Sequence, residues 1–435
     1  MSDFTHLHIH SEHSILDGFT TTETIPGIAA ELGQSAIALS DHGTLGGALK
    51  FYNGALEHEV KPLFAVETYV TPDIDIKDKT SQTWHLILVA TSRTGLENLF
   101  RMSKIAWTRG FYKKPRVDYA ILDAHSEGIV ALSACMASEI CRAMEVDGDW
   151  SGKYEITPAA VEAADRYKKI YPGRFFIELQ PGNTQHLNTT LAELASGTST
   201  PTTVTVDSHY DHCSSKAVEE LLLVMQQGSG SKASDKEYAK LMFEEARRES
   251  NLLSRLDKLW PNRGLSYTNH ELHIMSRDEV VTKMSRQGFD GNALADSTLK
   301  IADRCENVEL IKKGKVYIPQ YDKTKNSDDL LRFLVMAGLK QRGLDKRSEY
   351  LERVEEELGI IKSKGFADYY LIVWDIYNEA RSRGIYVGPG RGSMAGSLCF
   401  YALKVTALDP IRYKLLFFRF IDAGQGSFDP AFPCA

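Results

Sequence analysis

Near its start the chain reads Thr5-His6-Leu7-His8-Ile9-His10-Ser11-Glu12-His13, which we interpret as a strand that carries a row of histidines. Side chains of a strand point alternately to opposite faces, so the first three histidines share one face and the two apolar residues share the other. An isolated pair of alternating histidines is more often a solvent-facing strand than a binding site. The interpretation therefore depends on which residues accompany this stretch elsewhere in the chain.

Six further short apolar runs follow the first one at residues 7–9. They are residues 36–39, 63–66, 86–89, 129–132, 175–179 and 203–206. Helix-like stretches, such as 22–32 and 161–170, lie between several of these runs. Alternating strands and helices are typical of βα units around a parallel sheet. The sequence therefore predicts an α/β fold, a distorted (β/α)7 barrel.

Ligand-type residues stand where several of these runs end. Asp17 follows the first run, Asp41 and His42 follow 36–39, Glu67 follows 63–66, Cys135 follows 129–132, and Asp207 and His209 follow 203–206. Because the carboxyl ends of barrel strands converge on one rim, these side chains are expected to meet in space. Mixed histidine, carboxylate and cysteine ligation suits zinc, manganese or iron. Several such ions close together would support phosphoester hydrolysis.

Three residues stay ambiguous by pattern alone. His85 precedes its apolar run instead of following it, which favours an ordinary core or rim histidine. Cys135 by itself is more often a buried small hydrophobe than a ligand. Glu178 lies at the end of the run 175–179, where a structural salt bridge is as consistent as a ligand role.

The motifs His8-x-His10, Asp17-Gly18, Ser40-Asp41-His42-Gly43, Glu67, His85-Leu86, Cys135 and Asp207-x-His209 resemble, in this order, those of the PHP (polymerase and histidinol phosphatase) domain. The resemblance implies a full set of metal ligands: His8, His10, Asp17, His42, Glu67, His85, Cys135, Asp207 and His209. It also implies a cluster of about three divalent ions, with Asp41 supporting the ligands instead of binding metal. Some polymerase members of that family have lost ligands, whereas this chain resembles the intact kind.

The composition limits the class of protein. A chain of 435 residues has room for roughly two or three domains, and we predict domains at 1–225 and 286–435 with a connecting region at 226–285. Six cysteines without a CxxC pair fit a reducing compartment, and we expect the cytoplasm. No apolar run approaches the roughly 20 residues that span a bilayer, so no membrane contact is expected.

The net charge of −7 predicts no general affinity for nucleic acid, so any such contact needs a local basic surface. The basic run at 109–116 is either a surface of this kind or a solvated charged loop.

A glycine-rich segment follows three helical patterns in the last third of the chain. The helical patterns cover 327–342, 348–364 and 367–383, and the last of them is expected to be mostly buried. The next segment reads Tyr386-Val387-Gly388-Pro389-Gly390-Arg391-Gly392-Ser393. Glycines allow close approach of the backbone to an anion, and arginine and serine side chains can contact phosphate oxygens. Taken alone, such a segment is equally consistent with a tight turn.

Residues 365–375, 388–393, 401–403, 408–410 and 416–420 resemble the palm of the bacterial C-family replicative DNA polymerases, the family of DNA polymerase III alpha subunits. The resemblance implies a polymerase beta-like α+β palm in which Arg391, Gly392 and Ser393 bind the triphosphate of a nucleotide. That family continues with a Pro-Asp-x-Asp-x-Asp strand whose aspartates bind magnesium. Residues 426–435 depart from this pattern, and Asp429 precedes a proline, so no catalytic residue for polymerisation is assigned.

Together the resemblances imply an N-terminal portion of a DNA-directed DNA polymerase, a nucleotidyltransferase of DNA replication. Its PHP domain would act as a metal-dependent 3′-5′ exonuclease or phosphoesterase. Polymerisation would need magnesium and aspartates from downstream sequence or a second polymerase chain. Primer-template DNA, nucleoside triphosphates and replisome subunits are the implied partners. Two alternatives stay open: a freestanding PHP phosphatase for a small phosphorylated metabolite, and a non-catalytic scaffold half of a split polymerase.

Overall fold

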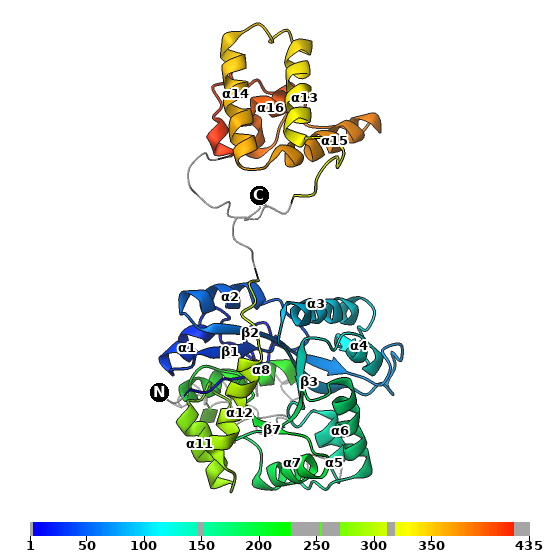
Figure 1. The fold of residues 1–435 in the computed structure, drawn as a ribbon, viewed down its shortest axis with the longest axis vertical. Helices are drawn as coiled ribbons and strands as arrows, with labels where there is room; N and C mark the ends of the chain where they lie inside the picture. The colour runs from blue at the N-terminus through cyan, green and yellow to red at the C-terminus, as the bar shows by residue number, and fades with distance from the viewer. Residues whose placement is uncertain (1–2, 147–151, 228–252, 255–269, 311–317, 422–435) are drawn as a thin grey trace, which may run out of the picture. The chain divides into compact units, whose positions relative to one another are not determined.

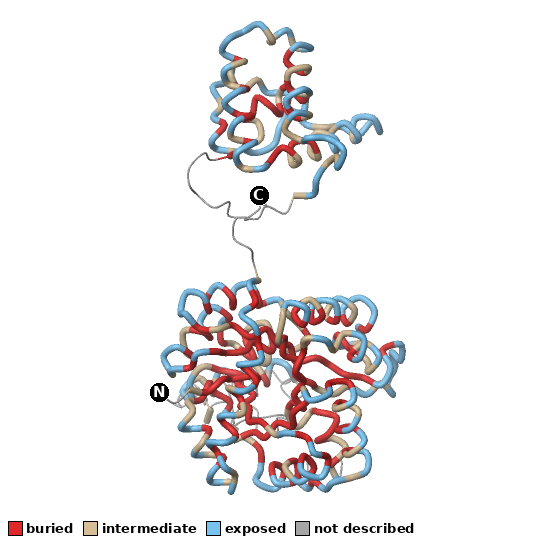
Figure 2. Tube along the Cα trace, viewed as in Figure 1, coloured by how far each residue is buried: buried red, intermediate tan, exposed pale blue. Residues whose placement is uncertain are grey.

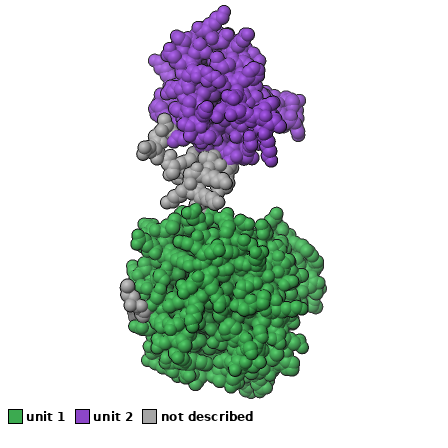
Figure 3. All heavy atoms as spheres, viewed as in Figure 1, with its two compact units in different colours: residues 1–310 green, residues 311–435 purple. Residues whose placement is uncertain are grey.

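The computed structural model describes residues 3–146, 152–227, 253–254, 270–310 and 318–421. The chain forms two compact units, residues 1–310 and residues 311–435 (Figure 3). Each unit has an apolar core of its own, the first around a sheet and the second among helices. Much of the predicted connecting region 226–285 lies outside the described residues.

A seven-stranded sheet forms the centre of the first unit, with β1, β2, β3, β5, β6 and β7 hydrogen-bonded in that order and β4 paired with β2. The strands are β1 (Ala36–Leu39), β2 (Lys61–Val70), β3 (Trp84–Ala90), β4 (Arg116–Val117), β5 (Ile129–Leu132), β6 (Phe175–Leu179) and β7 (Thr202–Val204). Every predicted run after the first therefore coincides with a strand or overlaps one. The strands are largely buried, and they ring the middle of the unit (Figure 2).

The first predicted strand closes the sheet by short contacts on both of its sides. His6 forms a parallel bridge with Ile37 of β1, and Ile9 forms another with Ser208 beyond β7. The amide of His10 also donates to the carbonyl of Ser208 at 2.8 Å. Because these contacts join the two end strands, the sheet curves into the predicted distorted barrel (Figure 1).

One strand runs against the predicted parallel order. β3 pairs antiparallel with both β2 and β5, whereas the other strand pairs are parallel. The predicted arrangement of βα units around a parallel sheet therefore does not hold at β3, because residues 71–83 join β2 to β3 without the helix that a parallel crossover usually needs. The amino end of β3 consequently lies at the rim where the parallel strands have their carboxyl ends.

Helices cover the outside of the barrel (Figure 1). The described helices of the first unit are α1 (Ile25–Glu31), α2 (Ala48–Glu57), α3 (Arg93–Thr108), α4 (Tyr119–Ala124), α5 (Glu139–Met144), α6 (Pro158–Ile170), α7 (Gln185–Gly197), α8 (Lys216–Gln227), α11 (Arg277–Arg286) and α12 (Gly291–Asp303). The predicted helix 161–170 begins earlier, at Pro158, because the hydroxyl of Thr157 caps it by accepting from the amide of Ala160 at 3.1 Å.

The first unit extends past the predicted domain limits at 225 and 285. Helices α11 and α12 pack on the barrel, and the hydroxyls of Ser297 and Thr203 lie 2.7 Å apart. The hydroxyl of Thr298 accepts from the amide of Thr5 at 3.1 Å. These contacts tie α12 to β7 and to the first segment of the chain, so this unit continues to residue 310.

The second unit is helical over its described residues, 318–421, which contain no strand. It comprises α13 (Ser327–Gln341), α14 (Ser348–Ser363), α15 (Ala367–Ser382), α16 (Leu398–Ala402) and the 3-10 turns η2 (Gly392–Gly396) and η3 (Phe417–Arg419). The three predicted helices are confirmed, but α15 is not mostly buried. Only its start packs into the core, where Tyr370 stacks on Phe400 with ring centroids 4.0 Å apart, while Ile376 is 59% exposed. No described helix has both the length and the apolarity to cross a membrane.

A fully buried carboxylate, that of Glu357 on α14, organises the core of the second unit. It accepts hydrogen bonds from the amides of Leu398 and Cys399 at 2.9 and 3.0 Å, and from the hydroxyl of Ser397 at 2.9 Å. It also accepts from Nε of Arg353 at 2.9 Å. The first amides of a helix lack intrahelical acceptors and attract negative charge. Glu357 therefore binds α14 to the start of α16, directly after the glycine-rich segment.

Replacing Glu357 with alanine is expected to destabilise the second unit by about 2–4 kcal/mol, because buried amides and a guanidinium lose their acceptor. The measurement is denaturant unfolding followed by far-UV circular dichroism. Glu356 is exposed and adjacent, so Glu356→Ala serves as the control and should change the free energy of unfolding by less than about 0.5 kcal/mol. Equal effects of the two substitutions would contradict the role given to Glu357.

Candidate metal centre

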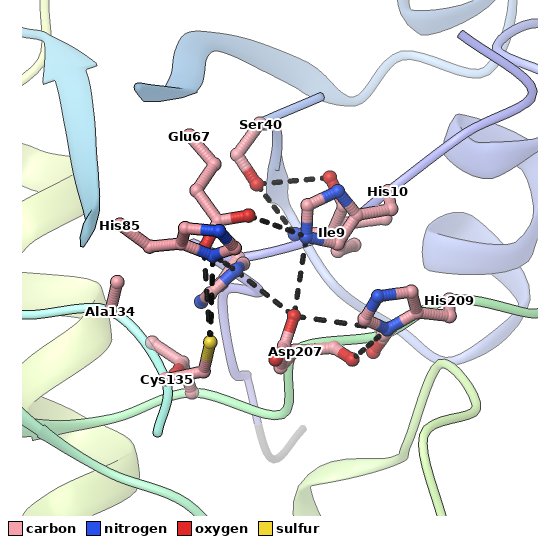
Figure 4. A network of polar contacts seen from close by, with 12 residues as sticks. Ile9, His10, Ser40, Glu67, His85, Ala134, Cys135, Asp207 and His209 are labelled. Atoms are coloured by element: carbon pink, nitrogen blue, oxygen red, sulfur yellow. Dashed lines mark hydrogen bonds and ion pairs between the residues drawn. The ribbon is translucent and has the colours of Figure 1, made fainter. Parts of the chain in front are cut away.

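Side chains from separate segments of the barrel converge at one rim (Figure 4). They are His8 and His10 of the first segment, Asp17 of the loop after it, His42 after β1, Glu67 in β2, His85 in β3, Cys135 after β5, and Asp207 and His209 after β7. All the predicted ligand residues therefore lie in one cluster. His85, which precedes its apolar run, reaches the cluster because β3 runs antiparallel to its neighbours.

The buried carboxylate of Glu67 lies among four histidines. One oxygen is 2.6 Å from Nδ1 of His42, and the other is 2.9 Å from Nδ1 of His85. Nε2 of His8 lies 3.5 Å from Oε1 of Glu67, and Nε2 of His10 lies 3.5 Å from Oε2. Glu67 thus connects residues that come from three different segments of the chain.

Asp207, which follows the last strand β7, faces His8 and His10. Its Oδ1 atom lies 3.0 Å from Nε2 of His8 and 3.2 Å from Nε2 of His10. The backbone of Asp207 has φ +61°, a left-handed conformation that costs energy for a residue other than glycine. Ala134, directly before Cys135, has φ +64°. Strained backbone therefore occurs at two positions that aim side chains into the cluster.

Asp17 and Cys135 complete the cluster on two of its sides. The carboxylate of Asp17 lies 3.1 Å from Nε2 of His42 and 3.6 Å from Nε2 of His209. The sulfur of Cys135 lies 3.7 Å from Nδ1 of His85 and 4.0 Å from Oε1 of Glu67. No disulfide involves this cysteine. Its sulfur is thus placed among ligand-type atoms, not in an apolar core.

The donor atoms fit a group of divalent metal ions. Three sets of residues offer ligand atoms that all lie within 4.8 Å of one another: His8, His10 and Asp207; His10, His42 and His209; and His42, Glu67 and His85. Buried atoms of the cluster have no hydrogen-bond partner within the described part of the chain, among them Nε2 of His8, Nε2 of His10, Oδ1 of Asp17, Nδ1 of His42, Oε2 of Glu67 and Oδ1 of Asp207. They approach one another at ion-pair distances without hydrogen-bond geometry. Buried polar atoms are rarely left without a hydrogen-bond partner, and metal ions bound between these atoms would take the place of that partner.

The histidines of the cluster differ in their affinity for protons. Burial opposes a charge on His42, but the carboxylates of Glu67 and Asp17 outweigh it and raise the pKa of His42 to about 10. His8 is equally buried, and its carboxylate neighbours raise its pKa well above the ordinary value. Burial and the positive charges nearby lower the pKa of His10 to about 3. A metal binds the neutral imidazole, so ion binding must displace protons from some of these residues and not from others.

Glu178, whose role the sequence left open, supports His8 from outside the cluster. Its Oε2 atom lies 3.1 Å from Nδ1 of His8, and its Oε1 atom accepts from the amide of Ala134 at 2.6 Å. The hydroxyl of Thr205 donates to it as well. Carboxylates that bind the outer nitrogen of a ligating histidine fix its ring orientation. Glu178 has the geometry for that role towards Nε2 of His8.

Asp41 directly precedes His42 in the sequence, and its carboxylate contacts Ser11 and Ser14 beside the cluster. Its carboxylate accepts from the amide and the hydroxyl of Ser11 at 2.7 and 2.8 Å, and from the hydroxyl of Ser14 at 2.8 Å. Oγ of Ser14 lies 3.0 Å from Nδ1 of His10. Asp41 is therefore linked to His10 through Ser14, which is the geometry that a residue supporting a ligand would need.

Sequence reasoning missed Glu219 of α8. The residue is fully buried, and neither oxygen of its carboxylate has a hydrogen-bond partner among the residues that the structure describes. Burial raises its pKa to about 7, while the charge of His209 acts in the opposite direction. A glutamate in an amphipathic helix carries no signal of such burial, because only the packing of α8 against the barrel removes it from water.

The predicted phosphate-binding residues lie together in the second unit. Arg391, Gly392 and Ser393 are exposed at the start of η2, and Gly392 has φ +54°, which favours glycine. A Cβ atom at Gly396 would come within 2.5 Å of the carbonyl of Leu416, so the segment is closely packed behind this exposed edge. Asp429 and the rest of 422–435 lie outside the described residues.

Two protein-family profiles match the chain. The PHP domain matches residues 6–182, and the bacterial DNA polymerase III alpha NTPase domain matches residues 329–428. The first match contains the cluster residues from His8 to Cys135, and Asp207 and His209 lie beyond it.

Proteins named DNA polymerase III subunit alpha are similar over nearly the whole chain. The one from Helicobacter pylori is 31% identical over 443 residues, which cover 96% of this chain and 34% of that protein. The one from Aquifex aeolicus is 33% identical over 440 residues, which cover 97% of this chain and 35% of that protein. The chain thus spans about a third of the length of these relatives. A solved amidohydrolase from Chromobacterium violaceum is similar at a TM-score of 0.32 and 13% identity over 48% of this chain and 88% of that chain.

Metal binding is expected to release protons and to strengthen as the pH rises. The pKa values of His8 and His42 are raised, against burial, by neighbouring carboxylates, so these two residues hold protons near pH 7 that an ion must displace. The pKa of His209 is raised in the same direction, against burial, by Asp207 and Asp17. Titration calorimetry of the chelator-treated protein with zinc or manganese, in two buffers of different ionisation enthalpy, should show a release of about one to three protons. An affinity that stays constant between pH 6 and pH 8 would contradict this assignment.

Asp41→Asn is expected to weaken metal binding by about 10–100-fold without unfolding the barrel, because Ser14 loses a charged acceptor and His10 loses its fixed orientation. Competition with a chelating dye measures the affinity. Asp165 is exposed on α6, and Asp165→Asn should leave the affinity unchanged. The supporting role fails if Asp41→Asn binds metal as the unaltered chain does.

Proposed function

The chain belongs to the family of bacterial DNA polymerase III alpha subunits and matches about a third of their length. From this premise we propose that its PHP domain is a metal-dependent phosphoesterase that shortens DNA from the 3′ end. The proposal is supported above all by the complete set of ligand-type side chains at one rim of the barrel, with buried donor atoms left unpaired within the described part of the chain. A barrel kept only as a scaffold has no physical need for such a cluster, because unpaired buried polar atoms cost free energy.

The proposed ligands are His8, His10, Asp17, His42, Glu67, His85, Cys135, Asp207 and His209, which would hold about three ions of zinc, manganese or iron. Divalent ions in this position would supply Lewis acidity that activates water and offsets the charge of a phosphodiester in its transition state. The chain itself supplies the rigid ligand positions: Glu178 orients His8, and Asp41 orients His10 through Ser14.

For the second unit we propose nucleotide binding by Arg391, Gly392 and Ser393, in a palm that works with magnesium. Exposed backbone at a glycine-rich turn and an arginine side chain suit a triphosphate. The proposed partners are primer-template DNA, nucleoside triphosphates, further replisome subunits, and the chain or downstream segment that supplies catalytic aspartates. The assignment of DNA-directed polymerase activity rests on the relatives, since the described residues include no pair of carboxylates at this turn.

Two other functions are less well supported. A freestanding phosphatase for a small metabolite would not need similarity to the polymerase relatives over 96% of the chain. A non-catalytic scaffold would not need buried ligand atoms without partners. Phosphoesterase activity within a polymerase subunit accounts for both observations.

His10→Ala and Asp207→Ala are each expected to lower 3′ shortening of DNA by at least about 100-fold, because each removes a ligand-type side chain whose donor atom is buried in the cluster. The assay follows a 5′-labelled strand, single or annealed as a primer, in the presence of zinc or manganese, and bound metal is measured alongside. His58 is exposed, and His58→Ala is the matched control. Shortening that persists in both ligand variants would refute the proposal, and bound metal without any shortening would favour the scaffold.

A further inference from the structure

An exposed aromatic and basic surface lies beside the metal centre, and nothing in the cluster itself accounts for it. It consists of Trp107 at the end of α3 with Phe111, Lys113 and Lys114 of the loop that leads to β4; these four residues are called the aromatic-basic surface. Trp107 is 51% exposed and Phe111 is 44% exposed. Their rings stack with centroids 5.5 Å apart and planes 20° apart. Two large side chains therefore present apolar area to water at one place.

The aromatic-basic surface is joined to the metal centre by direct contacts. Nε1 of Trp107 donates to the carbonyl of Gly43 at 2.9 Å, and Gly43 directly follows the proposed ligand His42. Nζ of Lys114 lies 4.3 Å from the ring centroid of Tyr69. The ring of Tyr69 in turn lies 5.2 Å from that of His85. The stacked rings and a lysine charge thus border the rim where the cluster lies.

The charge of this surface favours an anionic partner. Residues 107–116 contain Arg109, Lys113, Lys114 and Arg116 and no acidic residue, within a chain of net charge −7. Arg109 pairs with Asp75 at 2.7 Å, and Arg116 is buried. Lys113 and Lys114 are exposed, and neither has a carboxylate within ion-pair distance in the described part of the chain. Two cations are therefore available to a polyanion.

The loop is held in place before any partner binds. The guanidinium of Arg116 donates to the carbonyls of Gly110, Ile74 and Ile76 at 3.0, 3.1 and 3.0 Å. The amide of Tyr112 donates to the carbonyl of Lys114 at 3.1 Å, which forms a tight turn at the lysines. A rigid loop loses little conformational entropy when a ligand binds.

We propose that the aromatic-basic surface binds single-stranded DNA and leads its 3′ end to the metal centre. Unpaired bases would stack on Trp107 and Phe111, and Lys113 and Lys114 would contact the phosphates that follow. Aromatic side chains next to cations are the chemistry that binds single strands, whereas a duplex keeps its base faces covered. The inference rests on the proposed phosphoesterase function and specifies its substrate as an unpaired strand.

Binding is tested separately from cleavage. Fluorescence anisotropy is measured with the metal-loaded chain and an oligodeoxythymidine of about 15 nucleotides, labelled at its 5′ end and protected by phosphorothioate linkages at its 3′ end. Phe111→Ala is expected to weaken binding by about tenfold through the loss of base stacking. The slope of log affinity against log salt should fall by about 1.4 in magnitude in Lys113→Ala/Lys114→Ala, since each phosphate contact to a single strand contributes about 0.7. Both variants leave the hydrogen bond of Trp107 to Gly43 in place.

Matched controls are Phe100→Ala, which removes another exposed aromatic side chain of α3, and Lys300→Ala on α12. Both should bind the oligonucleotide as the unaltered chain does, and all variants should keep the same metal content. Unchanged affinity in the Phe111 and lysine variants, or equal affinity of the unaltered chain for a duplex of the same length, would overturn the inference. If the unaltered chain binds this strand through the surface yet never shortens the same strand without the phosphorothioate linkages, the proposed function fails while the binding surface stands.

Discussion

The pairing of residues 6–10 with β1 on one side and with the segment after β7 on the other holds the barrel closed. Two bridges and a few backbone hydrogen bonds make this junction, yet it carries His8 and His10 into the centre of the metal cluster. Because side chains alternate along an extended segment, a shift of one residue would turn Leu7 and Ile9 towards the cluster and the histidines away from it. The contacts that close the sheet therefore also place His8 and His10 among the other ligand-type side chains.

The cluster concentrates charge where water is excluded, and the fold must compensate for it. Glu67 and Asp207 are buried among imidazoles, and burial of an unpaired charge is costly. Supporting groups reduce the cost, as when Glu178 contacts His8 and Asp41 binds the serines beside His10. The remaining donor atoms face one another without hydrogen bonds, which leaves bound cations as the natural compensation.

Local charge differs from the average charge in both units. The chain is acidic overall, yet residues 107–116 present exposed lysines next to stacked aromatic rings at the edge of the metal centre.

In the second unit, Glu357 is buried beneath the glycine-rich turn, where it holds α14 and α16 together while Arg391 stays exposed. Screening in water limits the range of exposed charges to about 8–10 Å, so a phosphate responds to such neighbours and not to the net charge.

The sequence by itself determined the barrel, the helices of the second unit and the ligand-type residues that follow apolar runs, because strand and helix periodicity and the ends of apolar runs are local patterns that a single chain displays. His85 and Cys135 were predicted as ligands only through the resemblance to the PHP domain. Only the tertiary structure decided the direction of β3, and with it the place of His85, since strand direction depends on how a connection crosses the sheet. It also decided the role of Glu178, the burial of Glu219, the extent of the first unit and the exposure of α15. Each of these depends on which surfaces pack together from distant parts of the chain, and no local pattern encodes that contact.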